Sequence, residues 1–309
     1  MKINKSSIKK SISLLKKDEC IGVPTETVYG LAANAYSDTA VSKIFKLKKR
    51  PKGNPLIVHY HSIKLLKKDC YINNRFQILY KKFCPGPLTF VLKLKKTSKI
   101  SKKVTNDKRN LAIRFPNHKI IKYLLKHLNF PIAAPSANLS TSISPVTKND
   151  VVEEFGKKIK HVIDGGRSKI GLESTIIDLT SKPKIIRLGG LDIKNLNKIL
   201  KINLNYKSNS KLKYPGQSRL HYSPGIPIKL NIKKPKKKSA YMLINKKKFD
   251  DKNFFYLSKN KNLTEAGKNL YKTLRIIKKR KYKLIEVENI PNIGLGRTIN
   301  DRLKRASSK

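Results

Sequence analysis

The chain has 309 residues, a formal net charge of +52 at pH 7, 39% hydrophobic residues and no Trp. This length has room for two domains and for a sizeable core without disulfide or metal staples. Three scattered cysteines, with no CxxC or Cys/His spacing, argue against a disulfide framework or a zinc site. No apolar run is long enough for a membrane span, and none follows the basic start as in a signal peptide. We therefore expect a soluble, cytoplasmic protein.

The basic residues occur in every predicted element and in both halves of the chain. We attribute this spread to an A/T-biased genome that places Lys wherever the surface tolerates it. The charge then predicts only weak, salt-sensitive RNA binding. Arg is more informative, because only 12 of the 71 basic residues are Arg and a retained guanidinium indicates bidentate anion binding. Four of them stand in unusual local sequence: Arg50, Arg114, Arg187 and Arg219.

Short apolar strands alternate with amphipathic helices through the first 200 residues, which is typical of an α/β fold. Ser or Asp before the helical repeats and Pro behind them mark helix ends. Helices are predicted at 6–17, from 37 or 38 to 47, from 62, and at 74–83, 118–128, 150–158 and 192–200. Strands are predicted at 19–23, 55–58, 88–94, 111–115, 131–134, 161–164, 174–179 and 185–188. Residues 95–108 are polar and basic and predict an exposed loop.

The character of the chain changes at residues 203–225, which are polar and contain two Pro-Gly dipeptides around Arg219, His221 and Tyr222. We interpret this segment as a linker that carries functional side chains. A small α/β unit follows, with strands near 226–232, 239–244, 254–258 and 284–290 and helices near 262–280 and 296–306. The predicted domains are thus 1–202 and 226–309. Arg302 and Arg305 are expected on the exposed face of the last helix.

Functional side chains stand two residues apart at four places: Thr25 and Thr27, Lys48 and Arg50, His59 and His61, and Ser136 and Asn138. In extended backbone such side chains point to one face. Lys48 and Arg50 would then form a two-cation clamp suited to a polyphosphate. Ser136 and Asn138 follow a buried strand, where a hydroxyl and an amide can hold phosphate or ribose or a magnesium-bound oxygen.

Each pair taken alone also has a plain structural interpretation. Lys48 with Arg50 is a common surface pair in a Lys-rich chain, and Ser136 with Asn138 can cap a turn. Thr25 and Thr27 can be ordinary strand residues, and a lone His59 on an apolar strand is commonly a core histidine. The sequence contains no evident nucleophile–base–acid triad, metal cluster or Walker loop.

The combination of motifs resembles the YrdC-type threonylcarbamoyl-adenylate synthase family. The resemblance covers nearly all of residues 8–200, in order and without large gaps, and includes the K-x-R and S-x-N signatures. The second unit resembles that of the longer family members. The motifs are PTETVYGLAANA at 24–35, RPKGNPL at 50–56, LAIRFP at 111–116, APSANLS at 134–140, GLESTIID at 171–178, IIRLGG at 185–190, HYSP at 221–224 and GLGRTINDRLKRAS at 294–307.

This resemblance implies a twisted open mixed sheet around a basic cavity, with a small Rossmann-like α/β domain behind the linker. It implies a nucleotidyltransferase that converts L-threonine, bicarbonate and ATP, with Mg²⁺, into threonylcarbamoyl-AMP and pyrophosphate. Other proteins would transfer the product to adenosine beside the tRNA anticodon. The alternatives are a non-catalytic RNA-binding protein with the same concave basic surface and a hydrogenase-maturation relative. The second alternative would be expected to carry zinc-finger and acylphosphatase modules.

The resemblance also implies roles for individual residues. Catalysis is assigned to Lys48, Arg50, Ser136 and Asn138. ATP contacts are assigned to Arg50, Asn54, Asn110, Ser136, Ser144, Arg187, His221 and Tyr222, the last two as a lid from the linker. Threonine contacts are assigned to Thr27, His59, Arg114, Ala134 and Ser174, with Arg114 binding the carboxylate bidentately.

Overall fold

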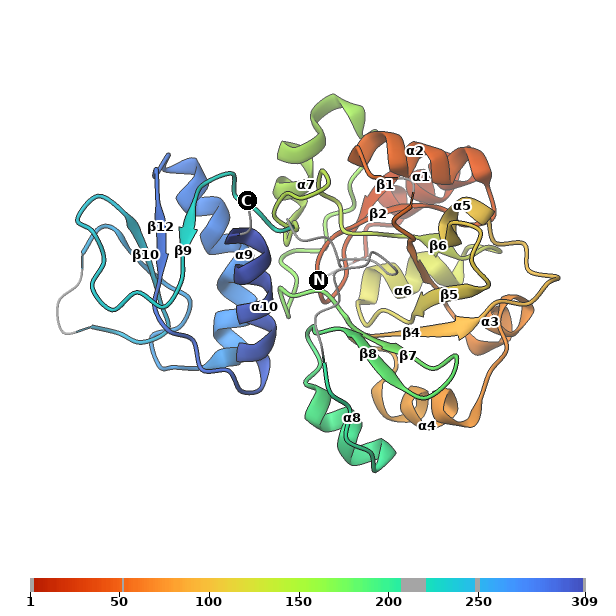
Figure 1. Ribbon diagram of the computed structural model, residues 1–309. Helices are drawn as coiled ribbons and strands as arrows, with labels where there is room; N and C mark the ends of the chain where they lie inside the picture. Colours follow the sequence, from red (N-terminus) through yellow and green to blue (C-terminus); the bar gives the residue numbers. More distant parts are fainter. Residues whose placement is uncertain (1–2, 52, 207–220, 248–250, 308–309) are drawn as a thin grey trace.

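Two sheets organise the computed structural model, which describes residues 3–51, 53–206, 221–247 and 251–307 (Figure 1). The larger is an eight-stranded mixed sheet in the order β1-β2-β6-β3-β5-β4-β7-β8. The smaller has four parallel strands in the order β11-β10-β12-β9. The predicted fold class, a mixed α/β sheet followed by a smaller α/β unit, is confirmed.

The larger sheet and its helices occupy the first two thirds of the chain. Its strands are β1 (Ile21–Val23), β2 (Gly30–Asn34), β3 (Ile57–His59), β4 (Leu88–Lys93), β5 (Asn110–Arg114), β6 (Ile132–Ala133), β7 (Thr175–Asp178) and β8 (Lys184–Arg187). Its helices are α1 (Lys5–Lys16), α2 (Asp38–Lys48), α3 (Ile63–Asp69), α4 (Asn74–Phe83), α5 (Lys102–Thr105), α6 (Lys119–Lys126), α7 (Lys148–Phe155), the 3₁₀ turn η1 (Gly156–Lys158) and α8 (Ile193–Leu200). The side chains of Ser37, Ser62 and Asn73 accept backbone N–H groups at helix starts, as the polar residues there predict.

Side chains along the central strands β3 and β5 alternate between the two faces of the sheet. One face packs into the main core, and we call the opposite one the functional face. Val58 and Ile113 join the main hydrophobic core, whereas Ile57 and Ala112 join a small cluster on the opposite face. His59 and Arg114 share the parity of Ile57 and Ala112, so they lie on that second face. The parallel pairing of β3 and β5 sets His59 opposite Arg114.

Two local predictions for the larger unit are wrong, and one strand was not predicted. Residues 161–164 form only an isolated bridge between Val162 and Gly22 instead of a strand. The expected exposed loop at 95–108 contains α5, and its Val104 is fully buried in the main core. The small-residue segment at Gly30–Asn34 is a strand, because backbone pairing to β1 and β6 outweighs the low strand propensity of Gly and Ala.

The smaller unit packs its helices against the larger one. Helices α9 (Leu263–Lys279) and α10 (Leu295–Ser307) lie between the small sheet and the first unit (Figure 1). The sheet strands are β9 (Ile228–Lys229), β10 (Ala240–Leu243), β11 (Phe254–Tyr256) and β12 (Ile285–Val287). The expectation that Arg302 and Arg305 are exposed is therefore wrong: they are 1% and 8% exposed. Within the described residues, no helix combines the length and apolarity that crossing a bilayer requires.

Candidate active site

A cavity of about 50 Å³ opens on the functional face of the large sheet, beside the second unit. It gathers side chains from β3, β5, β8, the loops around β6 and β7, and the segment that enters the second unit. The predicted site residues that line it are Thr27, Arg50, His59, Arg114, Ala134, Ser136, Ser174, Arg187, His221 and Tyr222. Glu173 also lines it, together with Val28, Ile57 and Pro135.

Arg114 is held from three sides. Its Nη1 donates to Thr27 Oγ1 at 2.7 Å, and its Nε donates to the Gly86 carbonyl at 3.3 Å. Its Nη2 lies 2.7 Å from Glu26 Oε1, although outside hydrogen-bond geometry, with both side chains almost fully buried. The guanidinium therefore has a fixed orientation and a buried counter-charge.

His59 beside it is a neutral imidazole. Burial, and then the positive charge of Arg114, hold the pKa of His59 well below its usual range. Its Nδ1 is buried and has no hydrogen-bond partner among the described residues. A buried polar atom on a cavity wall that lacks a hydrogen-bond partner is suited to bind a ligand that supplies the missing hydrogen bond. Neutral His59 can accept a hydrogen bond there.

A second wall of the cavity is cationic. Arg50 donates to Asn54 Oδ1 at 2.6 Å and to the Asn54 and Pro55 carbonyls at 3.0 and 2.9 Å. Arg187 donates to the Ser174 carbonyl from Nε at 3.2 Å and from Nη2 at 2.9 Å. Burial, and then Arg187, lower the pKa of Arg50 to about 9, and burial also lowers the pKa of Arg187. Burial opposes the charged form of both Arg side chains, so an anionic ligand would stabilise them.

Lys48 lies one step behind that wall. The structure corrects the premise that Lys48 and Arg50 stand on extended backbone, because Lys48 ends α2 and Lys49 is left-handed with φ 48°. The Lys48 ammonium donates to the carbonyls of Ser136 and Asn138 and so braces their loop. Burial, and then Arg50, hold the pKa of Lys48 well below its usual range.

The other predicted residues surround the cavity without lining it. Asn138 donates its amide hydrogens to the Leu139 and Ser142 carbonyls, and its buried Oδ1 has no hydrogen-bond partner among the described residues. Ser144 donates to Glu173 Oε1 at 2.6 Å, and Asn54 holds Arg50. Asn110 lines a neighbouring cavity of about 400 Å³ on the far side of Pro55.

His221 and Tyr222 close the cavity from the linker. Their rings lie 4.0 Å apart between centroids, and Tyr222 has the left-handed backbone angle φ 67°. Burial lowers the pKa of His221 to about 3. The Tyr222 hydroxyl and His221 Nδ1 have no hydrogen-bond partner in the described chain. Arg219, which the sequence singled out, lies outside the described residues.

Sequence reasoning missed two residues of this site, Glu26 and Glu173. Both stand inside motifs that were quoted for their other members. A signal was available, because the chain has only 19 acidic residues and both of these are surrounded by small, apolar or hydroxyl residues. The argument that a retained Arg is informative applies equally to a retained Glu.

Comparison with known proteins places this architecture and site. A family model described as "Telomere recombination", the Sua5/YciO/YrdC domain, matches residues 13–189, and one described as "Threonylcarbamoyl-AMP synthase, C-terminal domain" matches residues 191–308. The threonylcarbamoyl-AMP synthase of Pyrococcus abyssi is 34% identical over 99% of this chain and 95% of its own. The Bacillus subtilis enzyme of that name is 32% identical over 98% and 94%.

The crystal structure of P. abyssi Sua5 complexed with L-threonine superimposes with a TM-score of 0.90, covering 99% of this chain and 96% of that one. The chain therefore belongs to the threonylcarbamoyl-AMP synthase family, in its two-domain form. Family members of this kind are enzymes.

Proposed function

We propose that this protein is a nucleotidyltransferase that forms L-threonylcarbamoyl-AMP and pyrophosphate from L-threonine, bicarbonate and ATP. The observation that carries the proposal is one cavity with two different walls. One wall has an oriented guanidinium next to a neutral imidazole, and the other has buried cations. The names of the relatives and the threonine bound in the P. abyssi structure support the same assignment.

Threonine would bind at the wall formed by Arg114, Thr27 and His59. The carboxylate takes guanidinium hydrogens of Arg114, whose plane is fixed by its bonds to Thr27 and Gly86. The ammonium must lose a proton before its nitrogen can attack the bicarbonate carbon. That proton passes to solvent, because the burial and the Arg114 charge that keep His59 neutral oppose its protonation. Neutral His59 is suited to accept a hydrogen bond from the amine and so to orient it. Attack then yields the carbamate and releases water.

ATP would bind at the cationic wall. The carbamate oxygen attacks the α-phosphorus, the bond to the bridging oxygen breaks, and pyrophosphate leaves. Arg50 and Arg187 can neutralise charge that develops on the phosphoryl oxygens, while Lys48 keeps the loop at Ser136 in place. Positioning and electrostatics suffice for this step, so the site needs no nucleophilic side chain.

The cavity must enlarge for both substrates to enter. Ligand pockets typically measure about 300–1,000 Å³, whereas this cavity measures about 50 Å³. His221 and Tyr222 come from the linker and line the cavity, so we infer that they withdraw for ATP and return over it. Closure would protect the labile carbamate from water.

Mg²⁺ would arrive with ATP. The described residues contain no group of three or more His, Cys, Asp or Glu side chains that could hold a metal ion. The unpartnered Asn138 Oδ1 fits a metal-bound role better than a phosphate contact, because an amide oxygen attracts cations and repels phosphate oxygens. When bound, Mg²⁺ neutralises phosphate charge and thereby favours departure of pyrophosphate.

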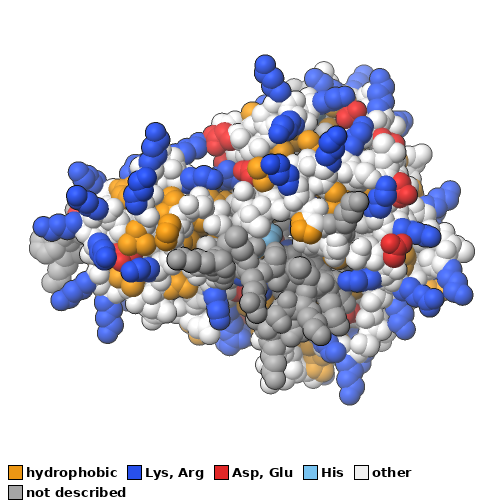
Figure 2. Space-filling view, turned by 45° about the horizontal axis from the view of Figure 1, so that its top comes forward, with side chains coloured by type: hydrophobic (Ala, Val, Ile, Leu, Met, Phe, Trp, Pro, Cys, Tyr) orange, Lys and Arg blue, Asp and Glu red, His pale blue; other side chains and the backbone are white. Residues whose placement is uncertain are grey.

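The remaining proposals concern organisation and partners. The division into a catalytic domain at 1–202, a linker and lid at 203–225 and a C-terminal domain at 226–309 stays a proposal, as does a cytoplasmic location. The product would pass to proteins that modify tRNA. The described Lys and Arg side chains are scattered over both units on the face seen in Figure 2. Such scatter favours weak, non-specific RNA binding over a dedicated RNA footprint.

A product assay tests the proposed reaction. The full chain is incubated with ATP, Mg²⁺, bicarbonate and labelled threonine, and pyrophosphate and labelled threonylcarbamoyl-AMP are measured. Controls omit threonine or bicarbonate in turn, and both should abolish product. ATP consumption that ignores these omissions would overturn the assignment. Tight RNA binding without any product would instead favour the non-catalytic alternative.

A further inference from the structure

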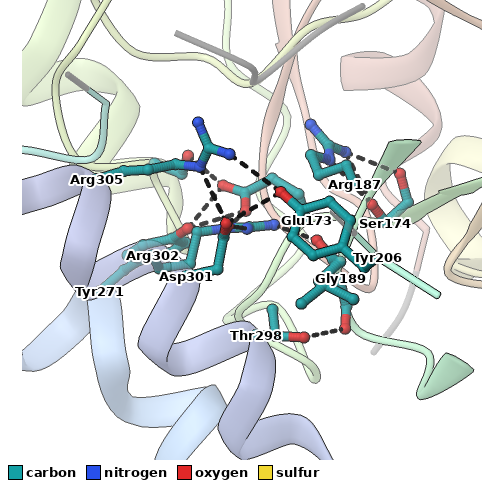
Figure 3. Close-up of polar contacts among 12 residues, drawn as sticks. Glu173, Ser174, Arg187, Gly189, Tyr206, Tyr271, Thr298, Asp301, Arg302 and Arg305 are labelled. Carbon is teal, nitrogen blue, oxygen red and sulfur yellow. Dashed lines mark hydrogen bonds and ion pairs between the residues drawn. The ribbon is translucent and has the colours of Figure 1, made fainter. Parts of the chain in front are cut away.

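Glu173 is the centre of a buried polar cluster that joins the two units (Figure 3). Its Oε1 accepts from Ser144 Oγ at 2.6 Å and from the Tyr271 hydroxyl at 2.9 Å. Its Oε2 accepts from the same hydroxyl at 2.9 Å and from Arg302 Nε at 2.9 Å. Both oxygens are thus occupied, so this carboxylate serves neither as a free base nor as an open metal ligand. Its role is to hold its neighbours.

Arg302 uses every nitrogen of its guanidinium in this cluster. Besides the bond to Glu173, Nη2 donates to the Leu188 carbonyl at 2.6 Å, and Nη1 donates to Asp301. Leu188 directly follows Arg187 of the cationic wall. The side chain of Arg302 is 1% exposed. One residue of α10 therefore fixes both the carboxylate in the cavity wall and the backbone next to Arg187.

Tyr222 is held from the same side. The guanidinium carbon of Arg302 lies 4.9 Å from the centre of the Tyr222 ring, and the Tyr271 ring stacks on it at 5.7 Å with an interplanar angle of 20°. The left-handed backbone of Tyr222 is unfavourable for a tyrosine and persists only where surrounding contacts enforce it. Those contacts come from α9 and α10 of the second unit.

The charges of the cluster are mutually dependent. Burial opposes ionisation of Glu173, but Arg302 and then Arg187 overcome it and hold its pKa at about 2. Removing one partner of such a pair leaves an uncompensated buried charge. The Tyr222 ring also loses one of its two packing contacts when the guanidinium is lost. Arg302 therefore holds Glu173 and Tyr222 in place, and both of these residues line the cavity in which the substrate would bind.

We propose that Arg302 is a positioning residue for the nucleotide half of the site. Acting through Glu173 and the face of Tyr222, it makes docking of the C-terminal helices a condition for a correctly formed ATP pocket. The threonine wall at Arg114 and His59 has no contact with this cluster among those recorded for the described residues. The inference rests on the proposed function for its kinetic test, because ATP and threonine must both be substrates.

The alternative is that Arg302 only stabilises the contact between the two units and has no effect on the ATP pocket. Thr298 offers a matched control for that possibility. It lies one helical turn from Arg302 on α10 and donates from Oγ1 to the Gly189 carbonyl at 3.0 Å across the same junction. Within the described part of the chain, Thr298 makes no hydrogen bond to Glu173 or Tyr222. Thr298→Val therefore removes a docking contact and leaves the positioning cluster in place.

The test compares Arg302→Lys, Arg302→Gln and Thr298→Val in the full chain. KM for ATP, KM for threonine and kcat are measured by pyrophosphate release, and thermal melting is recorded for each variant. We expect Arg302→Gln to raise KM for ATP by about tenfold and Arg302→Lys to raise it by less, with KM for threonine within about twofold of the original in both variants. Thr298→Val should keep both KM values even where its melting temperature falls.

Equal changes in both KM values, or lower melting without a kinetic change, would overturn the proposal. Should the Arg302 variants fail to fold, Tyr271→Phe decides, because it removes one donor to Glu173 and keeps the ring stacked on Tyr222. It should raise KM for ATP alone, and no such rise would count against the cluster. If the original chain makes no product, the proposed function fails, and ATP binding by calorimetry in the same variants still tests the positioning role.

Discussion

Oε1 of Glu26 lies 2.7 Å from Nη2 of Arg114, and both side chains are almost fully buried. Nη1 of the same guanidinium donates a hydrogen bond to Thr27 Oγ1. The residue that we propose to recognise the threonine carboxylate thus already has a carboxylate partner. Glu26 balances the charge of Arg114 and helps to fix its plane. The two following predictions test this relationship from either side.

Replacing Arg114 with Lys should weaken threonine binding more than ATP binding. Lys keeps the charge next to Glu26 but loses the planar fork that a bidentate carboxylate contact requires. We expect KM for threonine to rise by about tenfold or more, with KM for ATP nearly unchanged. Steady-state kinetics with each substrate varied in turn measures both values. Equal losses for the two substrates would contradict the role of Arg114.

Replacing Glu26 with Gln should destabilise the ligand-free protein and increase the stabilisation that threonine provides. The change leaves the buried guanidinium of Arg114 without its counter-charge, which costs about 3 kcal/mol. The threonine carboxylate would restore part of that loss. Urea unfolding with and without saturating threonine measures both effects. Glu19→Gln is the control, since Glu19 pairs with Lys43 at the surface. A threonine effect no larger than in the original chain would refute the prediction.

The stability of the protein should fall as the pH drops below about 6.5, partly through His221. Burial lowers the pKa of His221 to about 3 in the folded state, so below pH 6.5 the unfolded chain takes up a proton that the folded chain does not. Stability from this residue is therefore present above its unfolded pKa and is lost as the pH falls toward 3. Between pH 6.5 and 4 the loss is about 3 kcal/mol. In His221→Asn, unfolding free energies should fall less over this range. A parallel pH dependence in both proteins would show that another group titrates.

Tyr222→Leu should increase the fraction of ATP that is consumed without forming product. Leu loses the stacking on Tyr271 and the contact with Arg302, so water can reach the α-phosphorus of bound ATP and attack it in place of the carbamate oxygen, which releases AMP and pyrophosphate. We expect lower kcat and fewer molecules of product for each ATP consumed, measured as the ratio of threonylcarbamoyl-AMP to pyrophosphate.

Deleting residues 215–225 should reduce turnover and leave the large sheet folded, although 215–220 lie outside the described residues. An unchanged turnover in the deletion would remove the lid proposal.

Much of the fold followed from local pattern. The helix at Asn74–Phe83 was predicted at its observed bounds, and the strands ending at His59 and Arg114 were predicted within a residue or two. Apolar periodicity and polar caps carry such information because they act over a few residues. The strand at Gly30–Asn34 was missed, because Gly and Ala have low strand propensity and one of its two partner strands, β6, is about 100 residues away in the sequence. Burial of Val104 also depends on distant contacts.

By itself, the sequence determined the family motifs, the strands that carry His59 and Arg114 near their ends, and the set of side chains able to meet threonine and ATP. Only the tertiary structure decided what those side chains contact. It turned Lys48 toward the Ser136 loop, set Glu26 against Arg114, and buried Arg302, expected at the surface, against Glu173. The physical reason is distance along the chain. Arg302 and Glu173 are 129 residues apart, and no local period records a charge pair that forms only when two units dock.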